Sequence, residues 1–259
     1  MDIWRPFKIE QDQCLSWQIG PLKLWLQRTE NEWHLASERA PEEEDALGPA
    51  TPCNKPEQMQ WKRWTASGES NLVQNIPVMP DRSIIVRPET PLTIPHGNQA
   101  LFYVTIPVWV RVAVGQNAQM TLCEEPTVIL SHSWFGQPTA GELCYSLRTS
   151  ARRTLDRLGR RPHGAVCPVR VQNDAAVQLD FERLCVQVNH LNIYAGKGHM
   201  WTNEVKVTYK GEEKPTEIDF AQRSPTGDDV GELITEAREP LSRGFMQKGF
   251  DTFKSFTGM

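Results

Sequence analysis

Apolar and polar positions alternate along much of the chain in short runs, which is the pattern of β-strands with one buried face. Residues 21–27 alternate in this way and residues 32–36 repeat the pattern, while the polar residues between them suit a hairpin turn. From Val73 onward such runs are dense and are bounded by proline, glycine or polar residues. The pattern predicts about a dozen short strands and little helix before residue 149. Because no βαβ alternation appears, we expect a mainly β fold, an antiparallel β-sandwich or a barrel-like domain.

The longest apolar run covers residues 100–110 and ends at Arg111. It is too short to cross a bilayer, and its β-branched and aromatic residues are typical of a buried strand. Pro107 lacks the N–H group that a central strand donates to its neighbour. It therefore predicts an edge, a bulge or a bend within this run.

Residues 38–60 interrupt the strand pattern. Four acidic residues at positions 42–45 are followed by Pro49, Pro52 and Pro56. Such a segment buries too little apolar surface to offset the entropy of ordering it, so we expect a mobile insertion. It is either an acidic tether for a basic partner or, more simply, a solvated loop.

A basic helix is predicted over about residues 147–160. Leu147, Ala151, Leu155 and Leu158 recur at helical spacing and form one narrow apolar stripe. Five arginines occupy the rest of the helix surface: Arg148, Arg152, Arg153, Arg157 and Arg160. Guanidinium groups bind carboxylates and phosphates, so this face is a candidate for a protein partner or an anionic membrane surface. The alternative is a solvated face whose arginines pair with the excess carboxylates of the domain.

The last part of the chain has the composition of a helical tail over residues 228–259, after a single β domain over residues 1–222. A short helix follows Asp228 and Asp229, and Pro240 ends or kinks it. Beyond it, one half of the helical wheel is apolar: Leu241, Phe245, Met246, Phe250, Phe253 and Phe256. This amphipathic helix would cover its own domain, dock on a partner or another subunit, or lie at a membrane surface.

Composition narrows the classes of function. A net charge of −4 and a pI near 5.9 argue against a general nucleic-acid binder, and no aromatic residues alternate with the arginines to stack bases. The first residues have no basic and apolar regions of a secretory signal, so we expect a cytoplasmic protein, with the periphery of the inner membrane as the alternative. The six cysteines are scattered without a C-x-x-C spacing, which indicates reduced and mostly buried thiols.

Several short motifs together resemble one known family. They are Ser133-Trp-Phe-Gly, Gly141-Glu-Leu-Cys-Tyr-Ser, Ala151-Arg, Phe181-Glu-Arg-Leu-Cys, His190-Leu-x-x-Tyr194 and Trp201-Thr. The chain is similar through them, from about Pro21 to about Tyr209, to a prokaryotic family named only as a domain of unknown function, number 432. The resemblance implies no catalytic residues, because the family has no established activity. It implies an association with small mechanosensitive channels.

The sequence holds no recognisable catalytic constellation. Glu142, Cys144 and Tyr145 could be part of an active site with His132, but strand alternation places Glu142 and Cys144 on one face and fixes no histidine beside them. A buried structural thiol is the better interpretation. No metal-ligand spacing, nucleophile elbow or nucleotide loop occurs, so we expect no cofactor and no metal ion.

These observations favour a non-enzymatic interaction or regulatory module. Its contact surfaces would be the basic helix face and the amphipathic C-terminal helix, and its partner a protein or a second copy of the chain. Two alternatives stay open. One is an enzyme or small-ligand binder with a pocket near Trp134, Glu142 and Tyr145. The other is a peripheral membrane accessory protein associated with a channel.

Overall fold

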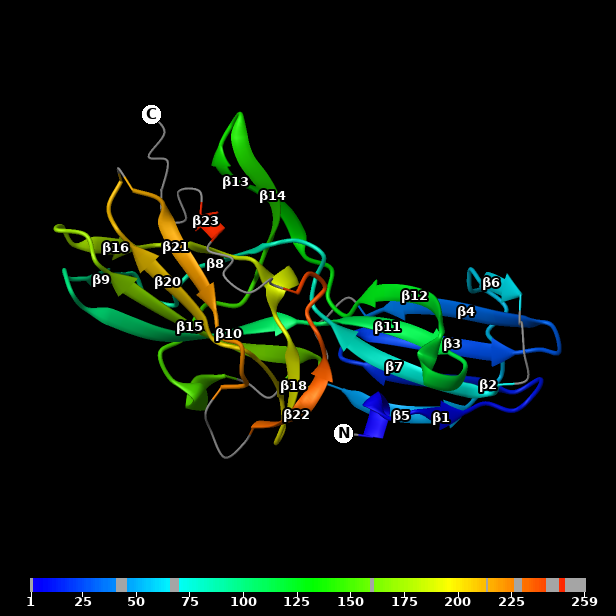
Figure 1. Cartoon of the computed structure of the whole chain (residues 1–259). Helices are drawn as coiled ribbons and strands as arrows, with labels where there is room; N and C mark the ends of the chain where they lie inside the picture. Colours follow the sequence, from blue (N-terminus) through cyan, green and yellow to red (C-terminus); the bar gives the residue numbers. More distant parts are fainter. Residues whose placement is uncertain are drawn as a thin grey trace. The chain divides into compact units, whose positions relative to one another are not determined.

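The computed structural model describes residues 2–40, 46–65, 70–158, 161–212, 214–225, 230–240 and 247–249. The mainly β prediction is confirmed, since the described residues form strands β1 to β23 (Figure 1). The helical segments within them are 3-10 turns of three residues each: η1 (Asp2–Trp4), η2 (Gln116–Ala118), η3 (Leu155–Arg157) and η4 (Val188–His190). In this described part, no helix has the length and apolarity needed to span a bilayer.

The chain divides into two compact units. The first comprises Met1–Val78, Pro107–Ile129 and Arg161–His163, and the second comprises the remaining segments. That the two behave as one domain over residues 1–222 stays a prediction.

The first unit holds two sheets. One has the order β5-β2-β3-β4-β6, and its central hairpin is the one that alternation predicts at residues 21–36. Its strands are β5 (Leu47–Pro52), β2 (Cys14–Ile19), β3 (Leu22–Arg28), β4 (Glu32–Arg39) and β6 (Lys62–Thr65). The other has the order β1-β7-β11-β12, with β1 (Phe7–Lys8), β7 (Leu72–Val78), β11 (Trp109–Val114) and β12 (Met120–Pro126). Leu22, Leu24, Leu26 and Leu35 are fully buried, as the apolar positions of an alternating hairpin should be.

Part of the acidic, Pro-rich insertion is a strand, which corrects the expectation of a loop. Leu47–Pro52 pairs antiparallel with β2 as β5, while residues 41–45 lie outside the described residues. Pro49 and Pro52 are tolerated because β5 is at the edge of its sheet, where one side of the strand needs no donor.

The second unit is built around β15 (Gly164–Asn173), whose residues are almost continuously buried. The large sheet has the order β22-β18-β19-β15-β20-β21-β23, and β10 (Gln99–Pro107) also pairs with β15. Its other strands are β18 (Ile193–Gly196), β19 (Met200–Thr202), β20 (Val205–Tyr209), β21 (Thr216–Phe220), β22 (Val230–Thr235) and β23 (Gln247–Gly249).

Not every strand pair in this unit is antiparallel, which corrects the sequence-based expectation. β15 runs parallel to both β19 and β20. No α-helix lies in the crossover between them, so the alternation typical of parallel sheets is absent from the sequence. The break expected at Pro107 is confirmed, because β10 ends there and β11 begins at Trp109.

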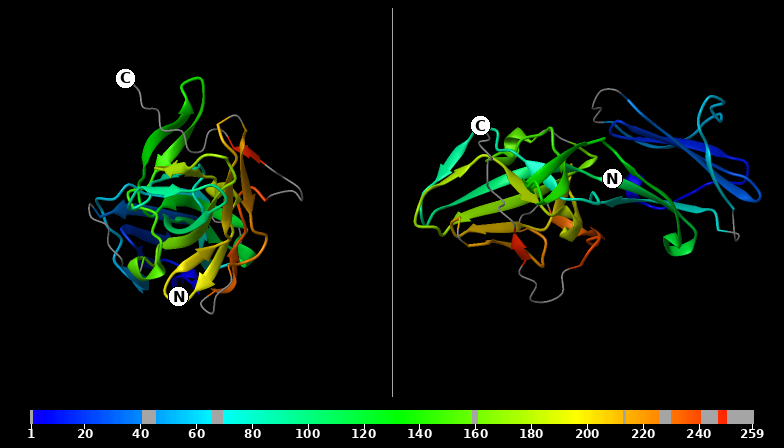
Figure 2. Two further views of the ribbon diagram at one scale, coloured as in Figure 1. Left: turned by 90° about the vertical axis from the view of Figure 1, so that its left-hand side faces the viewer. Right: turned by 90° about the horizontal axis from the view of Figure 1, so that it is seen from above.

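Two small sheets complete the second unit. One has the order β13-β14-β8-β17, with β13 (Ser131–Gln137), β14 (Ala140–Ser146), β8 (Ile84–Val86) and β17 (Leu184–Val186). The other pairs β16 (Leu179–Phe181) with β9 (Leu92–Ile94). The β13–β14 hairpin rises from the rest of the unit (Figure 1; Figure 2, left).

The predicted basic helix is wrong. Ala151 forms a β-bridge with Pro88, and Arg152 forms one with Tyr103, with both backbone hydrogen bonds made at 2.7 and 3.0 Å. Among the described residues of this segment, only Leu155–Arg157 forms a helical turn, and it is 3-10. A helix of about twelve residues is marginal alone, so strand pairing with distant segments overrides its apolar spacing.

The predicted helical tail is also wrong wherever the structure describes it. Val230–Thr235 is strand β22, paired with β18, where a short helix was expected. Gln247–Gly249 is strand β23, paired with β21. The apolar residues of the tail lie outside the described residues: Leu241, Phe245, Met246, Phe250, Phe253 and Phe256. Their role in docking stays a prediction.

Candidate functional site

The β13–β14 hairpin carries the sequence motifs that looked most informative. Its register is regular from Ser131 opposite Ser146 to Gln137 opposite Ala140, so a two-residue loop joins the strands. Trp134, Phe135 and Gly136 lie within β13, where Phe135 is buried and Trp134 is 49% exposed.

The indole of Trp134 lies against the opposite strand. Its Nε1 donates to the backbone oxygen of Gln137 at 3.0 Å. A Cβ atom at Gly141 would come within 2.5 Å of that Nε1 and 2.4 Å of the Phe135 oxygen. Glycine is therefore required at Gly141 for this aromatic position.

The outer side of β13 is an open sheet edge. Within the described part of the chain, β13 pairs with β14 alone. Its sequence contains no lysine and no proline, the residues that commonly block such edges. Beside the exposed Trp134, its cross-strand neighbour Leu143 is 44% exposed, so an apolar pair lies on the surface of the hairpin.

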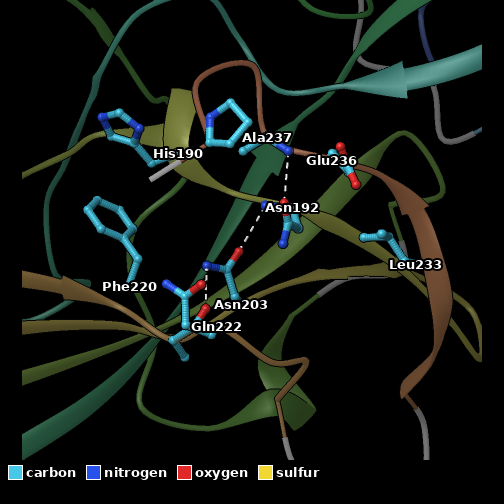
Figure 3. Close-up of a pocket in the computed structure, with 10 residues that line it drawn as sticks. His190, Asn192, Asn203, Phe220, Gln222, Leu233, Glu236 and Ala237 are labelled. Atoms are coloured by element: carbon cyan, nitrogen blue, oxygen red, sulfur yellow. Dashed lines mark hydrogen bonds between the residues drawn. The ribbon is translucent and has the colours of Figure 1, made fainter. Parts of the chain in front are cut away.

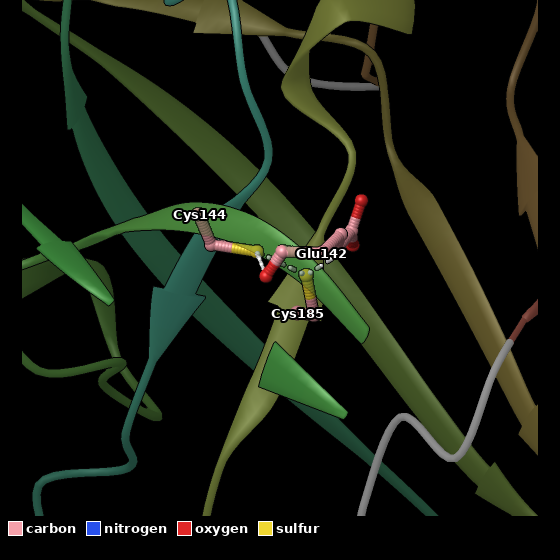
Figure 4. A group of neighbouring side chains, drawn as sticks. All are labelled: Glu142, Cys144 and Cys185. Atoms are coloured by element: carbon pink, nitrogen blue, oxygen red, sulfur yellow. Dashed lines mark hydrogen bonds between the residues drawn. The ribbon is translucent and has the colours of Figure 1, made fainter. Parts of the chain in front are cut away.

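A thiol–carboxylate cluster lies on the other face of the hairpin (Figure 4). The Cys144 and Cys185 Sγ atoms are 3.6 Å apart, and the Cys185 thiol donates to Glu142 Oε1 at 3.2 Å. Both cysteines are buried with Ile85 and Phe135. This confirms the prediction that Cys144 is a buried thiol.

Hydrogen bonding and burial keep Cys185 protonated. The pKa of Cys185 is raised well above its usual value, first by the hydrogen bond with Cys144, then by burial and by the Glu142 charge. Cys185 is therefore a thiol and not a thiolate at neutral pH, which does not suit a nucleophile. Among the described residues, Glu142, Cys144 and Cys185 are the group whose donor atoms could hold a metal ion, all within 4.8 Å of one another.

The pocket suggested near Trp134, Glu142 and Tyr145 is not formed by these three residues together. Paired residues of the hairpin share a face, so Trp134 lies with Leu143 and Tyr145, while Glu142 lies with Phe135 on the opposite face. His132 stacks on Tyr145 with ring centroids 5.3 Å apart. The two sides of this candidate active site are thereby separated.

Asp81 and Arg82 flank Tyr145. The Tyr145 hydroxyl donates to Asp81 Oδ1 at 2.9 Å, and burial followed by this bond raises the pKa of the phenol. Arg82 lies 5.8 Å from the Tyr145 ring centroid. Tyr145 is thus held as a neutral donor.

The five arginines do not form one helical face. Arg148 and Arg153 are exposed, and Arg153 lies over the Phe102 ring at 5.2 Å. Arg152 is half-buried and lies 3.8 Å from Glu89. The backbone of Arg157 belongs to η3, and Arg160 lies outside the described residues. Their binding to a partner or anion stays a prediction.

A small cavity of about 200 Å³ lies elsewhere in the second unit (Figure 3). Asn203 Oδ1 accepts the Asn192 N–H at 2.9 Å, and Asn203 Nδ2 donates to Ala221 at 2.9 Å. Asn192 Oδ1 in turn accepts the Ala237 N–H at 2.8 Å. The two amides join separate segments of the chain, and the cavity is below the usual size of a ligand pocket.

Sequence reasoning did not connect Cys185 with Glu142 and Cys144. Alternation correctly placed Glu142 and Cys144 on one face of a strand. Cys185 is 41 residues after Cys144 in the chain. It lies beside Cys144 because β14, β8 and β17 are neighbours in the sheet, and the sequence has no local signal for this strand order.

No curated protein and no solved structure matches the chain. One family does, over residues 3–254, and its description is "Protein of unknown function (DUF432)". This match is wider than the resemblance expected from the motifs. Because it covers nearly the whole sequence, the chain belongs to the DUF432 family, an uncharacterised family.

Proposed function

We propose that the protein is a non-enzymatic interaction module that associates through the open edge of β13. The observation that supports this proposal is the edge of β13. The strand is seven residues long and, among the described residues, is paired on one side alone. An open edge presents unpaired backbone donors and acceptors that another strand can satisfy. The exposed Trp134 and Leu143 add apolar surface next to it.

Two other edge strands carry residues that discourage strand addition. β5 contains Pro49 and Pro52, and β12 contains Glu124, Glu125 and Pro126. Prolines and charges block the approach of another strand. β13 has neither a proline nor an acidic residue, which supports pairing at its edge.

The partner that this edge fits best is a second copy of the chain. β13 has no acidic or basic residue apart from His132, so two copies do not repel each other. Antiparallel pairing centred on Trp134, the middle residue of β13, is two-fold symmetric and brings the two copies of this tryptophan together. Symmetric pairs are the commonest oligomers, and cross-strand aromatic pairs stabilise them.

Trp134→Lys tests this function, with Val177→Lys as the matched control. Both side chains are exposed in the second unit, but Val177 lies outside β13. Light scattering over a concentration series should give dimers for the wild type and Val177→Lys, and monomers for Trp134→Lys. Circular dichroism checks that both variants fold.

Two results would contradict the proposal. One is a wild type that stays monomeric at the highest concentration, including one that instead sediments with anionic vesicles, as the peripheral membrane alternative expects. The other is a folded Trp134→Lys variant that dimerises as strongly as the wild type.

A further inference from the structure

The donor atoms of Glu142, Cys144 and Cys185 have the spacing of a tetrahedral metal site. With Zn–S bonds of about 2.3 Å and Zn–O bonds of about 2.0–2.2 Å, two bound sulfurs lie about 3.8 Å apart and a sulfur and an oxygen about 3.5 Å apart. The observed distances are 3.6 Å between the two sulfurs and 3.2 Å between Cys185 Sγ and Glu142 Oε1. These two distances are within a few tenths of an ångström of the tetrahedral values. The third pair, Cys144 Sγ and the Glu142 carboxylate oxygen, lies within 4.8 Å and would close further when an ion binds.

The strands that carry these residues hold them in place. Glu142 and Cys144 are two residues apart on β14, so they share a face, and Cys185 is on β17. β8 pairs with both strands and lies between them. Figure 4 shows the two cysteine side chains pointing toward each other beside Glu142.

Burial differs across the cluster. Cys144 is completely buried and Cys185 nearly so, whereas Glu142 is exposed. An ion would thus reach the thiols from the side of Glu142. Ile85 and Phe135 pack around the sulfurs and keep the inner side dry.

The donor set selects the class of ion. Two sulfurs with one carboxylate favour a thiophilic ion over Mg²⁺ or Ca²⁺, which prefer oxygen ligands. We propose that Glu142, Cys144 and Cys185 bind one Zn²⁺ ion, with the fourth coordination position open.

Binding would require the loss of two thiol protons. Thiolate is the form of cysteine that binds the ion, so binding releases these protons and the affinity should rise with pH. This site is independent of the proposed self-association, since β13 contributes no ligand.

The test uses the reduced full-length chain and two ions as probes, Zn²⁺ with a competing chromophoric chelator and Co²⁺ by absorption spectroscopy. We expect one ion per chain and a thiolate-to-Co²⁺ charge-transfer band with the d–d bands of a tetrahedral site. Cys144→Ser and Cys185→Ser should abolish the band and weaken Zn²⁺ binding about 100-fold or more. Glu142→Gln, at an exposed position, should weaken it while keeping the fold.

Cys123→Ser is the matched control, because Cys123 is a half-buried thiol outside the cluster. It should bind Zn²⁺ as the wild type does. Absence of the thiolate band in the reduced wild type would overturn the proposal, as would wild-type affinity in a folded Glu142→Gln variant. A Cys144–Cys185 disulfide that forms in air while the reduced protein binds no Zn²⁺ would also overturn it.

Discussion

Arg39 and Glu125 join the two sheets of the first unit. Arg39 is the last residue of β4, and its Nη2 donates to Glu125 Oε2 of β12 at 2.7 Å, while its Nε donates to the Pro126 oxygen at 2.9 Å. Lys62 of β6 donates to the other oxygen of Glu125 at 3.0 Å. The carboxylate thus receives two charged donors, and hydrogen bonds to charged groups are the stronger ones.

We therefore expect Glu125→Gln to destabilise the protein by about 1–3 kcal/mol. Gln keeps the shape of the side chain but removes the charge that Arg39 and Lys62 contact. Urea unfolding measures the loss, and Glu57→Gln, at an exposed position of the same unit, is the control. Equal stability of the two variants would show that the contacts of Glu125 with Arg39 and Lys62 contribute nothing to the free energy of unfolding.

The same pair predicts how stability depends on pH. Burial alone would raise the pKa of Glu125, but the hydrogen bonds from Arg39 and Lys62 outweigh it and lower the pKa below its usual 4.5. A lowered pKa in the folded state gives a stabilisation that is present above the unfolded pKa and is lost as pH falls through the folded one. Unfolding midpoints between pH 7 and pH 3 should therefore fall less in Glu125→Gln than in the wild type.

Asn173 is a fully buried connector of the second unit. Its Nδ2 donates to the oxygens of Ile94 and Val177, both at 2.8 Å, and its Oδ1 accepts the Ala175 N–H at 3.0 Å. Asn173→Asp removes both donors and places a charge against two carbonyl oxygens. We expect a loss of about 2–4 kcal/mol in thermal or urea unfolding. Asn98→Asp changes an exposed amide and should leave stability nearly unchanged.

Local patterns in the sequence predicted where strands form, but not which segments pair with one another. The hairpin of β3 and β4 follows from alternation, because its pairs are close in sequence and its leucines share one buried face. The helix predicted from the apolar stripe between Leu147 and Leu158 is wrong for the opposite reason, because its residues pair with distant segments. Ala151 and Arg152 bridge to Pro88 and Tyr103, which are far away in the chain, so no local pattern reports the pairing.

The candidate metal site likewise has a part that the local pattern predicts and a part that it does not. Glu142 and Cys144 were placed on one face by the period of a strand, which is a local property. The third ligand, Cys185, depends on strand order across β8, and strand order is set by the packing of the whole unit. Composition gives the number of cysteines but does not show which of them lie close together in the fold.

Cys14 and Cys53 should form a disulfide under mild oxidation. They lie on or beside the neighbouring strands β2 and β5, with sulfurs 3.2 Å apart and the Cys53 N–H bonded to the Cys14 oxygen at 3.0 Å. Closing a loop of this length stabilises a chain by about 4 kcal/mol in the loop-entropy description. Burial, then the hydrogen bond with Cys53, raises the pKa of Cys14 to about 12, so little of Cys14 is thiolate at neutral pH.

The measurement is thermal unfolding after oxidation, with peptide mapping of the new bond. Oxidised protein should unfold at a higher temperature, and reduction should reverse the change. Cys53→Ser should show no such shift from this pair. A mapped Cys14–Cys53 bond without any rise in the unfolding temperature would contradict the prediction.

Gly141→Ala should disturb the hairpin that the proposed function uses. A Cβ atom there would lie 2.4 Å from the backbone oxygen of Phe135, which cannot move without separating the two strands, and 2.5 Å from Trp134 Nε1. We expect a loss of about 1–3 kcal/mol in urea unfolding, together with weaker dimerisation, because Trp134 is displaced from the centre of β13. Gly48→Ala is the matched control, since its Cβ meets no atom closer than 3.9 Å on the edge strand β5. If Gly141→Ala dimerises like Gly48→Ala despite its lower stability, the position of Trp134 does not determine self-association.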